Sequence, residues 1–205
     1  MIQMKKKGLL LVVSGPSGVG KGTICKEYLA KYDDCALSVS ATTRAPRDGE
    51  VDGVSYFFLS HEEFRKKIDA GGFLEHAVFC DNYYGTPKDA VMKQLDEGKN
   101  VILEIEVQGA LQVRSHYPEA VFIFVIPPST DELEARLRGR GTETDDVIAK
   151  RLERSKAEFK YIDKYNYVLV NDTIDAAVAR LNSIIEAEKC IMARNYDFVK
   201  KEFII

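Results

Sequence analysis

The sequence contains no apolar stretch near the ~18 residues that a membrane-spanning helix needs. Its first apolar run, Leu9 to Val13, follows three lysines but is shorter than the ~7–15 residues of a secretory signal. Because this run continues directly into a glycine-rich loop, it favours a buried strand. We therefore expect a cytoplasmic protein with no membrane partner.

Cysteine is scarce, and a large charge of one sign is absent. The four cysteines, at positions 25, 35, 80 and 190, form no CxxC pair and no Cys/His cluster with zinc-like spacing, which favours reduced thiols. The 29 basic and 32 acidic residues give a formal net charge of −3. We expect no nucleic-acid partner, and any site for an anion must be built locally.

Internal repeats and low-complexity linkers are also lacking, and 205 residues suit one domain, 1–205. Short apolar runs at 9–13, 101–105, 121–126 and 167–170 read as strands that are buried on both faces. Helical patterns lie between them, at 21–31, 131–139 and 175–189. This alternation predicts an α/β fold with a parallel central sheet and helices on both sides.

One long segment, residues 36–97, departs from the alternation. It holds the strand-like "SYFFLS", then a helix with Ser60 and Glu63 at capping-box spacing that stops at Gly71–Gly72. A further helix is predicted with Thr86 as its N-cap and Pro87 at its first position. We interpret 36–97 as a lobe inserted into a core made of 8–35, 98–137 and 151–190.

A second segment, "RLRGRGTETDD", is basic, then glycine-punctuated, then acidic, as a mobile flap between two helices would be. We place a lid at 138–150 and expect Arg138 and Arg154 to be solvated. The C-terminal segment 191–205 is partly apolar, so it could pack on the core or on a second subunit. The sequence leaves monomer and homodimer open.

The stretch "VVSGPSGVGKGT" differs at one position from the usual phosphate-binding loop. Gly15, Gly20 and Lys21 are in place, but Gly22 stands where Ser or Thr is usual, and Thr23 comes one residue late. Backbone N–H groups and the helix N-terminus would bind phosphates, and Lys21 would add a charge. Because Gly22 has no hydroxyl to ligate Mg²⁺, we expect the Mg²⁺ that accompanies ATP to be held by phosphates and water, without direct side-chain ligation.

Polar residues of the lobe suggest a second anion site. Arg44 and Arg47 flank Pro46, and two guanidinium groups so close would repel each other unless an anion lay between them. Tyr56 and Tyr84 add uncharged donors.

With these residues the chain closely resembles guanylate kinase over about residues 8–190. The resemblance is carried by "SGPSGVGKGT", "SATTRAPRDGEVDGVSYFF", "GGFLEHAVFCDNYYGTP", "ILEIEVQGA" and "RLRGRGTET". It implies a three-layer P-loop kinase fold with a parallel central sheet, an inserted mixed GMP-binding lobe and a short helical lid. The implied reaction transfers the γ-phosphoryl group of ATP to GMP, and also to dGMP, in purine nucleotide salvage.

The resemblance also implies roles for individual residues. The catalytic cations would be Lys21, Arg44, Arg136, Arg140 and Arg151. ATP would be bound by Gly15, Pro16, Ser17, Gly18, Val19, Gly20, Lys21, Gly22, Thr23 and Asn171. GMP would be bound by Ser40, Arg44, Arg47, Glu50, Tyr56, Glu75, Tyr84, Thr86, Glu104 and Glu106.

Guanine recognition by Glu75 has its own chemical logic. Guanine presents N1–H and N2–H₂ side by side, and one carboxylate can accept both hydrogen bonds, while a hydroxyl can donate to O6. AMP offers neither donor, so a buried Glu75 would be left unpaired against it. Taken alone, Glu75 could equally be an ordinary turn carboxylate.

Three other residues keep two interpretations. Glu104 and Glu106 follow an apolar strand, and they could contact Mg²⁺-bound water or pair with cations; Glu106 could also face the guanine or the arginines of the lobe. Asn171 could meet the adenine or belong to a turn or helix cap.

Other functions remain as alternatives. A kinase for AMP, UMP or dTMP would share the loop but not the guanine-binding set. A guanylate-kinase-like module that binds peptides without catalysis would tend to lose loop residues, which are present here. A GTP switch would need an Asn-Lys-x-Asp pattern, which the sequence lacks.

Overall fold

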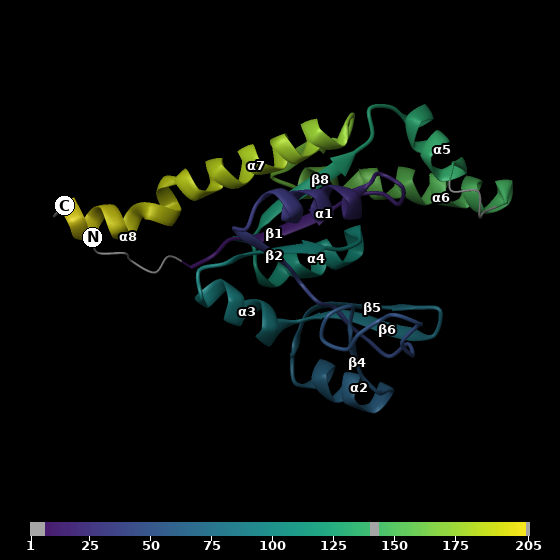
Figure 1. The fold of residues 1–205 in the computed structure, drawn as a ribbon, viewed down its shortest axis with the longest axis horizontal. Coiled ribbons are helices and arrows are strands. Elements are labelled where there is room, and N and C mark those ends of the chain that lie inside the picture. The colour runs from purple at the N-terminus through teal and green to yellow at the C-terminus, as the bar shows by residue number, and fades with distance from the viewer. Residues whose placement is uncertain (1–6, 140–143, 204–205) are drawn as a thin grey trace.

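The computed structural model describes residues 7–139 and 144–203, which form two sheets with helices around them (Figure 1). The larger sheet has five parallel strands in the order β2-β7-β1-β8-β9. Its strands are β1 Leu10–Ser14, β2 Cys35–Leu37, β7 Asn100–Glu104, β8 Val121–Ile126 and β9 Tyr167–Val170.

Helices cover both faces of this sheet, which explains why its central strands are apolar throughout. On one face, α1, α5, α6 and α7 share a core with the sheet, and α3 and α4 pack on the other face. These helices are α1 Lys21–Lys31, α3 Lys88–Asp96, α4 Val107–His116, α5 Thr130–Arg138, α6 Asp145–Glu158 and α7 Ile174–Cys190. The predicted three-layer α/β fold is confirmed. A 3₁₀ helix, Phe159–Lys164, joins α6 to β9.

The smaller sheet forms a lobe below the core in Figure 1. Its strand order is β4-β3-β6-β5, with β3 and β4 parallel and the other pairs antiparallel. The predicted capping box of Ser60 and Glu63 begins its helix, α2 His61–Asp69, whose Phe64 stacks on Phe73 at 4.3 Å between ring centroids. The strands are β3 Ala41–Thr42, β4 Phe57–Phe58, β5 Phe73–Phe79 and β6 Asn82–Pro87.

Two features differ in detail from the sequence-based prediction. β2 belongs to the larger sheet, so the chain leaves the core sheet after Leu37. The prediction that Thr86 caps the next helix is wrong: α3 begins at Lys88, and Pro87 is its N-cap. The Thr86 hydroxyl instead donates to Oε1 of Glu75 at 2.7 Å, because a buried carboxylate needs a donor and the register places these residues opposite each other.

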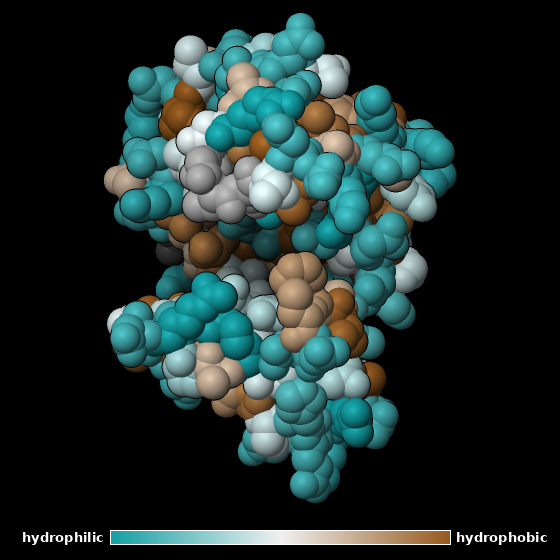
Figure 2. Space-filling model, turned by 90° about the vertical axis from the view of Figure 1, so that its right-hand side faces the viewer, coloured by the Kyte–Doolittle hydropathy of each residue, from teal (hydrophilic) through white to brown (hydrophobic). Residues whose placement is uncertain are grey.

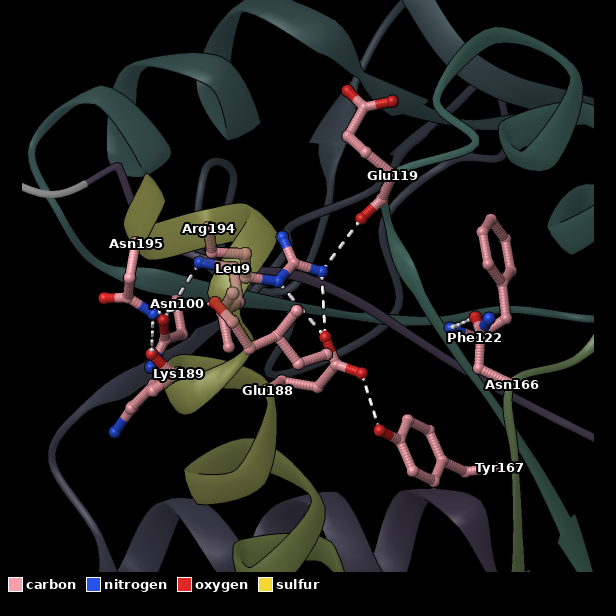
Figure 3. Close-up of polar contacts among 11 residues, drawn as sticks. Leu9, Asn100, Glu119, Phe122, Asn166, Tyr167, Glu188, Lys189, Arg194 and Asn195 are labelled. Carbon is pink, nitrogen blue, oxygen red and sulfur yellow. Dashed lines mark hydrogen bonds and ion pairs between the residues drawn. The ribbon is translucent and has the colours of Figure 1, made fainter. Parts of the chain in front are cut away.

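The C-terminal helix α8, Met192–Phe203, continues from α7 past the core (Figure 1) and leaves every one of its residues at least partly exposed. It is joined to the core by the buried carboxylate of Glu188, shown in Figure 3. Glu188 accepts hydrogen bonds from Tyr167 at 2.6 Å and from the Arg194 guanidinium at 2.9 and 3.1 Å. Arg194 also donates to the Glu119 carbonyl at 3.0 Å.

A cavity of about 1000 Å³ lies beside this junction, lined by Leu9, Leu10 and Asn100 at the amino ends of β1 and β7 and by Phe198 of α8. Ligand sites in open parallel sheets form at the opposite, carboxyl edge. We therefore expect the functional site at the carboxyl ends of the strands. Within the described chain, no helix is both long and apolar enough to span a membrane.

Replacing Arg194 with methionine should destabilise the protein. The substitution leaves the 5 % exposed Glu188 with Tyr167 as its remaining side-chain donor, so we expect the free energy of unfolding to fall by about 1–3 kcal/mol. Urea denaturation measures this. The control Lys66→Met breaks a pair with Glu62 that is 73 % and 78 % exposed, and it should change stability little. Equal effects of the two variants would contradict the assignment.

Candidate active site

The glycine loop connects β1 to α1 at the carboxyl edge of the sheet. Gly20 is the N-cap of α1 and has a φ of 90°, a left-handed conformation that favours glycine. The buried side-chain amide of Asn171 donates to the Val19 carbonyl at 2.7 Å and so fixes the position of the loop. The first turn of α1, "KGTI", contains no acid, and its N-terminus therefore suits an anion.

Lys21 lies back along this loop. Its Nζ donates to the carbonyls of Gly15 at 2.6 Å and Pro16 at 3.0 Å. Burial lowers the pKa of the Lys21 ammonium, and the carboxylates of Glu104 and other acids oppose that shift. A bound phosphate would offer Nζ a charged acceptor in place of two carbonyls.

Gly22 lies against the carboxylate of Glu104, a contact that the sequence analysis did not anticipate. A methyl group at residue 22 would be 3.3 Å from Oε2 and 3.4 Å from Oε1 of Glu104. The sheet register explains the contact, since Glu104 pairs with Val13 at the start of the loop. Residue 22, which lacks the usual hydroxyl, therefore has the carboxylate oxygens of Glu104 beside it.

Glu106 contacts a cation of helix α6. Its Oε2 accepts from Nη2 of Arg154 at 2.6 Å, and Nε of Arg154 donates to Glu158 at 3.2 Å. Arg154 is 52 % exposed, in line with the expectation of a solvated side chain, and it also pairs with these two acids. The sequence left several partners open for Glu106, among them a cation or the arginines of the lobe. The partner in the structure is a cation, Arg154, which belongs to α6 and not to the lobe. Arg138 is 50 % exposed and pairs with Glu134 and Asp145.

In the lobe, Glu50 is the anion that pairs with the Arg44 guanidinium and with the backbone of Arg47. The guanidinium group of Arg44 donates to both oxygens of Glu50, at 3.0 and 2.8 Å, and the backbone N–H of Arg47 donates to Oε2 at 2.7 Å. The hydrogen bond with Arg44 lowers the pKa of the Glu50 carboxyl. Arg44 also lies over the ring of Tyr56 at 5.5 Å, and that ring meets Tyr84 edge-on at 6.2 Å.

Glu75 is a buried acid, 8 % exposed, on β5 of the lobe. Burial raises the pKa of its carboxyl, while the hydrogen bond from Thr86 opposes this and nearby Glu106 adds to it. Ser40, just before β3, is half-buried, and its carbonyl accepts from Phe57. The structure thus brings Glu75 and Thr86 together.

The remaining predicted cations come from α5, α6 and the segment between them. Arg136 donates to the Asn171 carbonyl at 2.9 Å and to Glu132 at 2.8 Å, so it braces the end of β9. Arg151 is half-buried on α6, and Arg140 lies outside the described residues. Figure 2 shows a hollow between the upper body, which carries α5 and α6, and the lower lobe.

The charged groups of the candidate site come from both parts of the molecule. The loop, Lys21 and Glu104 belong to the core, and Arg44 and Glu75 belong to the lobe. Among residues 7–139 and 144–203, no three His, Cys, Asp or Glu side chains converge as a metal site. The arrangement can bind one phosphate group at the loop and a second at Arg44, with a polar group for a base on the lobe side.

Comparisons with known proteins identify the family of the chain. A family model described as guanylate kinase matches residues 7–188. The guanylate kinase of Caldanaerobacter subterraneus is 54 % identical over 200 residues, which is 98 % of this chain and 97 % of that protein. The guanylate kinase of Clostridium acetobutylicum is 56 % identical over 194 residues, or 95 % of this chain and 92 % of that protein.

Similarity extends to a solved structure. The crystal structure of guanylate kinase from Anaplasma phagocytophilum superimposes with a TM-score of 0.75 at 32 % identity, and the match covers 98 % of this chain and 97 % of that one. The chain therefore belongs to the guanylate kinase family.

Proposed function

We propose that this chain transfers the γ-phosphoryl group of ATP to GMP, and also to dGMP, giving ADP and GDP. The observation that carries the guanine assignment is the buried Glu75 carboxylate, whose Oε1 accepts the Thr86 hydroxyl at 2.7 Å. This carboxylate complements a base with two adjacent N–H donors. Guanine has both donors, and adenine lacks them.

The ATP phosphates bind along the loop from Gly15 to Gly20, where backbone N–H groups and the N-terminus of α1 face the anion. Lys21 exchanges its two carbonyl acceptors for phosphate oxygens. Asn171 acts by holding Val19 in place, which favours a role in loop positioning over a direct contact with adenine.

The GMP phosphate binds at Arg44, Arg47, Tyr56 and Tyr84. It competes with Glu50 for Nη1 and Nη2 of Arg44, which already donate to the carboxylate, although the guanidinium has further N–H groups. We infer that Glu50 keeps Arg44 oriented before the substrate arrives. The phosphate then takes over donors that are already aligned, which lowers the ordering cost of binding.

Phosphoryl transfer needs no protein nucleophile. An oxygen of the GMP phosphate attacks the γ-phosphorus of ATP in line, and the protein contributes positioning and neutralisation of charge. Lys21, Arg136, Arg140 and Arg151 are the cations proposed to act on the transferred group. Residues 138–150, as a lid, and the lobe would exclude water, which would otherwise hydrolyse ATP.

The residues present also fit a Mg²⁺ ion bound with ATP. Carboxylate oxygens are hard ligands, and Mg²⁺ keeps several waters, so Glu104 and Glu106 would hold it through those waters. When bound, the ion neutralises charge on the phosphate oxygens. The carboxylate beside Gly22 takes over part of the role of the missing hydroxyl.

Glu75→Gln tests the assignment of guanine recognition. The amide puts a donor where the carboxylate accepts, so we expect kcat/KM for GMP to fall roughly 10- to 100-fold while that for AMP does not fall. A coupled ADP-release assay with GMP, dGMP, AMP, UMP and dTMP measures this. Glu97→Gln, on an exposed turn, is the matched control. Wild-type protein that uses AMP faster than GMP would contradict the proposal.

Lys21→Met tests catalysis at the loop. Removing the ammonium while keeping the length of the side chain should lower kcat on the order of 10²- to 10³-fold, because a preorganised charge is lost at the transferring phosphoryl group. The exposed Lys26 of the same helix provides the control Lys26→Met, which should turn over normally. Unchanged turnover in Lys21→Met would contradict the catalytic role of the loop, and a wild type without turnover would favour a binding module.

The KM for GMP should depend on pH through Glu75. Only the ionised carboxylate accepts both N–H donors of guanine, and burial raises its pKa. As pH falls, GMP binding should therefore weaken at a higher pH than an ordinary carboxyl would cause, and binding should recover as pH rises. Steady-state KM values for GMP and ATP across acidic pH measure this. A KM for ATP that changes in parallel with that for GMP would place the titrating group elsewhere.

A further inference from the structure

Core helix α4 meets the lobe at the residue that carries the proposed guanine carboxylate. A methyl group at Gly109 of α4 would lie 2.9 Å from Oε2 and 3.3 Å from the carboxyl carbon of Glu75. Any larger residue would have to displace the carboxylate or the helix. The missing side chain at residue 109 therefore determines how closely Glu75 approaches the core.

Gln112, one turn along α4, binds the next residue of the same strand. Its Oε1 accepts from the backbone N–H of His76 at 3.1 Å, and its Nε2 donates to the His76 carbonyl at 2.9 Å. Since β5 is the edge strand of the lobe sheet, the Gln112 amide takes the place that a further strand would have.

The strand is irregular at this point. Its pairing with β6 shifts between Phe73 and Glu75, as at a β-bulge, which re-aims a side chain and interrupts the ladder. A cavity of about 260 Å³, lined in part by Glu75, His76 and Gln112, adjoins the contact. The backbone around Glu75 therefore depends on α4 for its position.

We propose that Gly109 and Gln112 are positioning residues that set the selectivity of this protein for a purine monophosphate carrying a 6-oxo and a 2-amino group. They hold the Glu75 carboxylate at one distance from the core. Gly109 does so by leaving space for it, and Gln112 does so by hydrogen-bonding the backbone of the adjacent His76. This rests on the proposed function, because it takes Glu75 as the acceptor for the base.

The position of the carboxylate matters for GMP and not for AMP. Two hydrogen bonds to adjacent donors form together only when both carboxylate oxygens are aligned with them, and a displacement of about 1 Å at a bound substrate can cost on the order of 10²-fold in rate. Adenine makes neither bond. A displaced Glu75 therefore lowers the use of GMP more than the use of AMP.

Gly109→Ala is the first test. Alanine is the better helix former, so thermal stability should not fall through loss of helix propensity. We expect the KM for GMP to rise on the order of tenfold or more while the KM for ATP stays near its wild-type value. The ratio of kcat/KM for GMP to that for AMP should fall in proportion. The control Gln108→Ala changes an exposed residue beside it on α4 and should leave both ratios unchanged.

Gln112→Met is the second test, because it keeps the size of the side chain and removes both hydrogen bonds to His76. It should lower the GMP-to-AMP ratio in the same direction, whereas the control Gln108→Met should not. A further variant combines Gly109→Ala with Glu75→Asp, whose shorter side chain leaves room for the new methyl group. We expect the double variant to lose less than the sum of the two single losses.

The outcomes separate this proposal from the function on which it rests. Glu75→Gln without effect on the GMP-to-AMP ratio would remove the guanine assignment itself. If Glu75→Gln lowers that ratio but Gly109→Ala and Gln112→Met leave it unchanged, the positioning role is wrong and the function stands. Equal losses for GMP and AMP in both α4 variants, or strict additivity in the double variant, would also overturn the positioning role.

Discussion

The site depends on the position of β1 between β7 and β8. Parallel pairing with β7 places Glu104 beside Val13, and pairing with β8 places Phe124 beside Ser14. Because the carboxyl ends of parallel strands meet at one edge, the glycine loop after β1 converges with Glu104 at the end of β7 and with Glu106 just after it. The loop is then held by its neighbours, including the amide of Asn171 after β9.

The charged groups of the site are already paired with other groups of the protein. Glu50 occupies Arg44, Glu106 occupies Arg154, and Lys21 donates to carbonyls of its own loop. Each substrate phosphate would therefore exchange one partner for another and would not meet bare charges. The side chains of the Arg154–Glu106 pair are 52 % and 69 % exposed, so exchanging that pair costs little. Those of the Arg44–Glu50 pair are 16 % and 21 % exposed, and there the geometry of the donors is already set.

Much of the core could be predicted from the sequence. The apolar runs 121–126 and 167–170 coincide with β8 and β9, the helix predicted at 21–31 is α1, and the helix predicted at 131–139 overlaps α5, whose N-cap is Ser129. The strands of the lobe and helix α4 are harder to predict from the sequence. β5 is bulged and has adjacent polar residues, Glu75 and His76, inside an apolar run, and α4 is buried at Val107, Gly109, Ala110 and Val113, so neither shows a clean period of two or 3.6.

Two of the contacts missed at the site share one cause: each joins residues that are distant in sequence through a glycine. Gly22 leaves room for Glu104, and Gly109 leaves room for Glu75. In the sequence, the first looks like a defect in a phosphate loop and the second like a weak point in a helix. In the structure each glycine admits a carboxylate of proposed function, one on the metal side and one on the base side. The role of such a glycine can be inferred only when the fold shows which side chain occupies the space beside it.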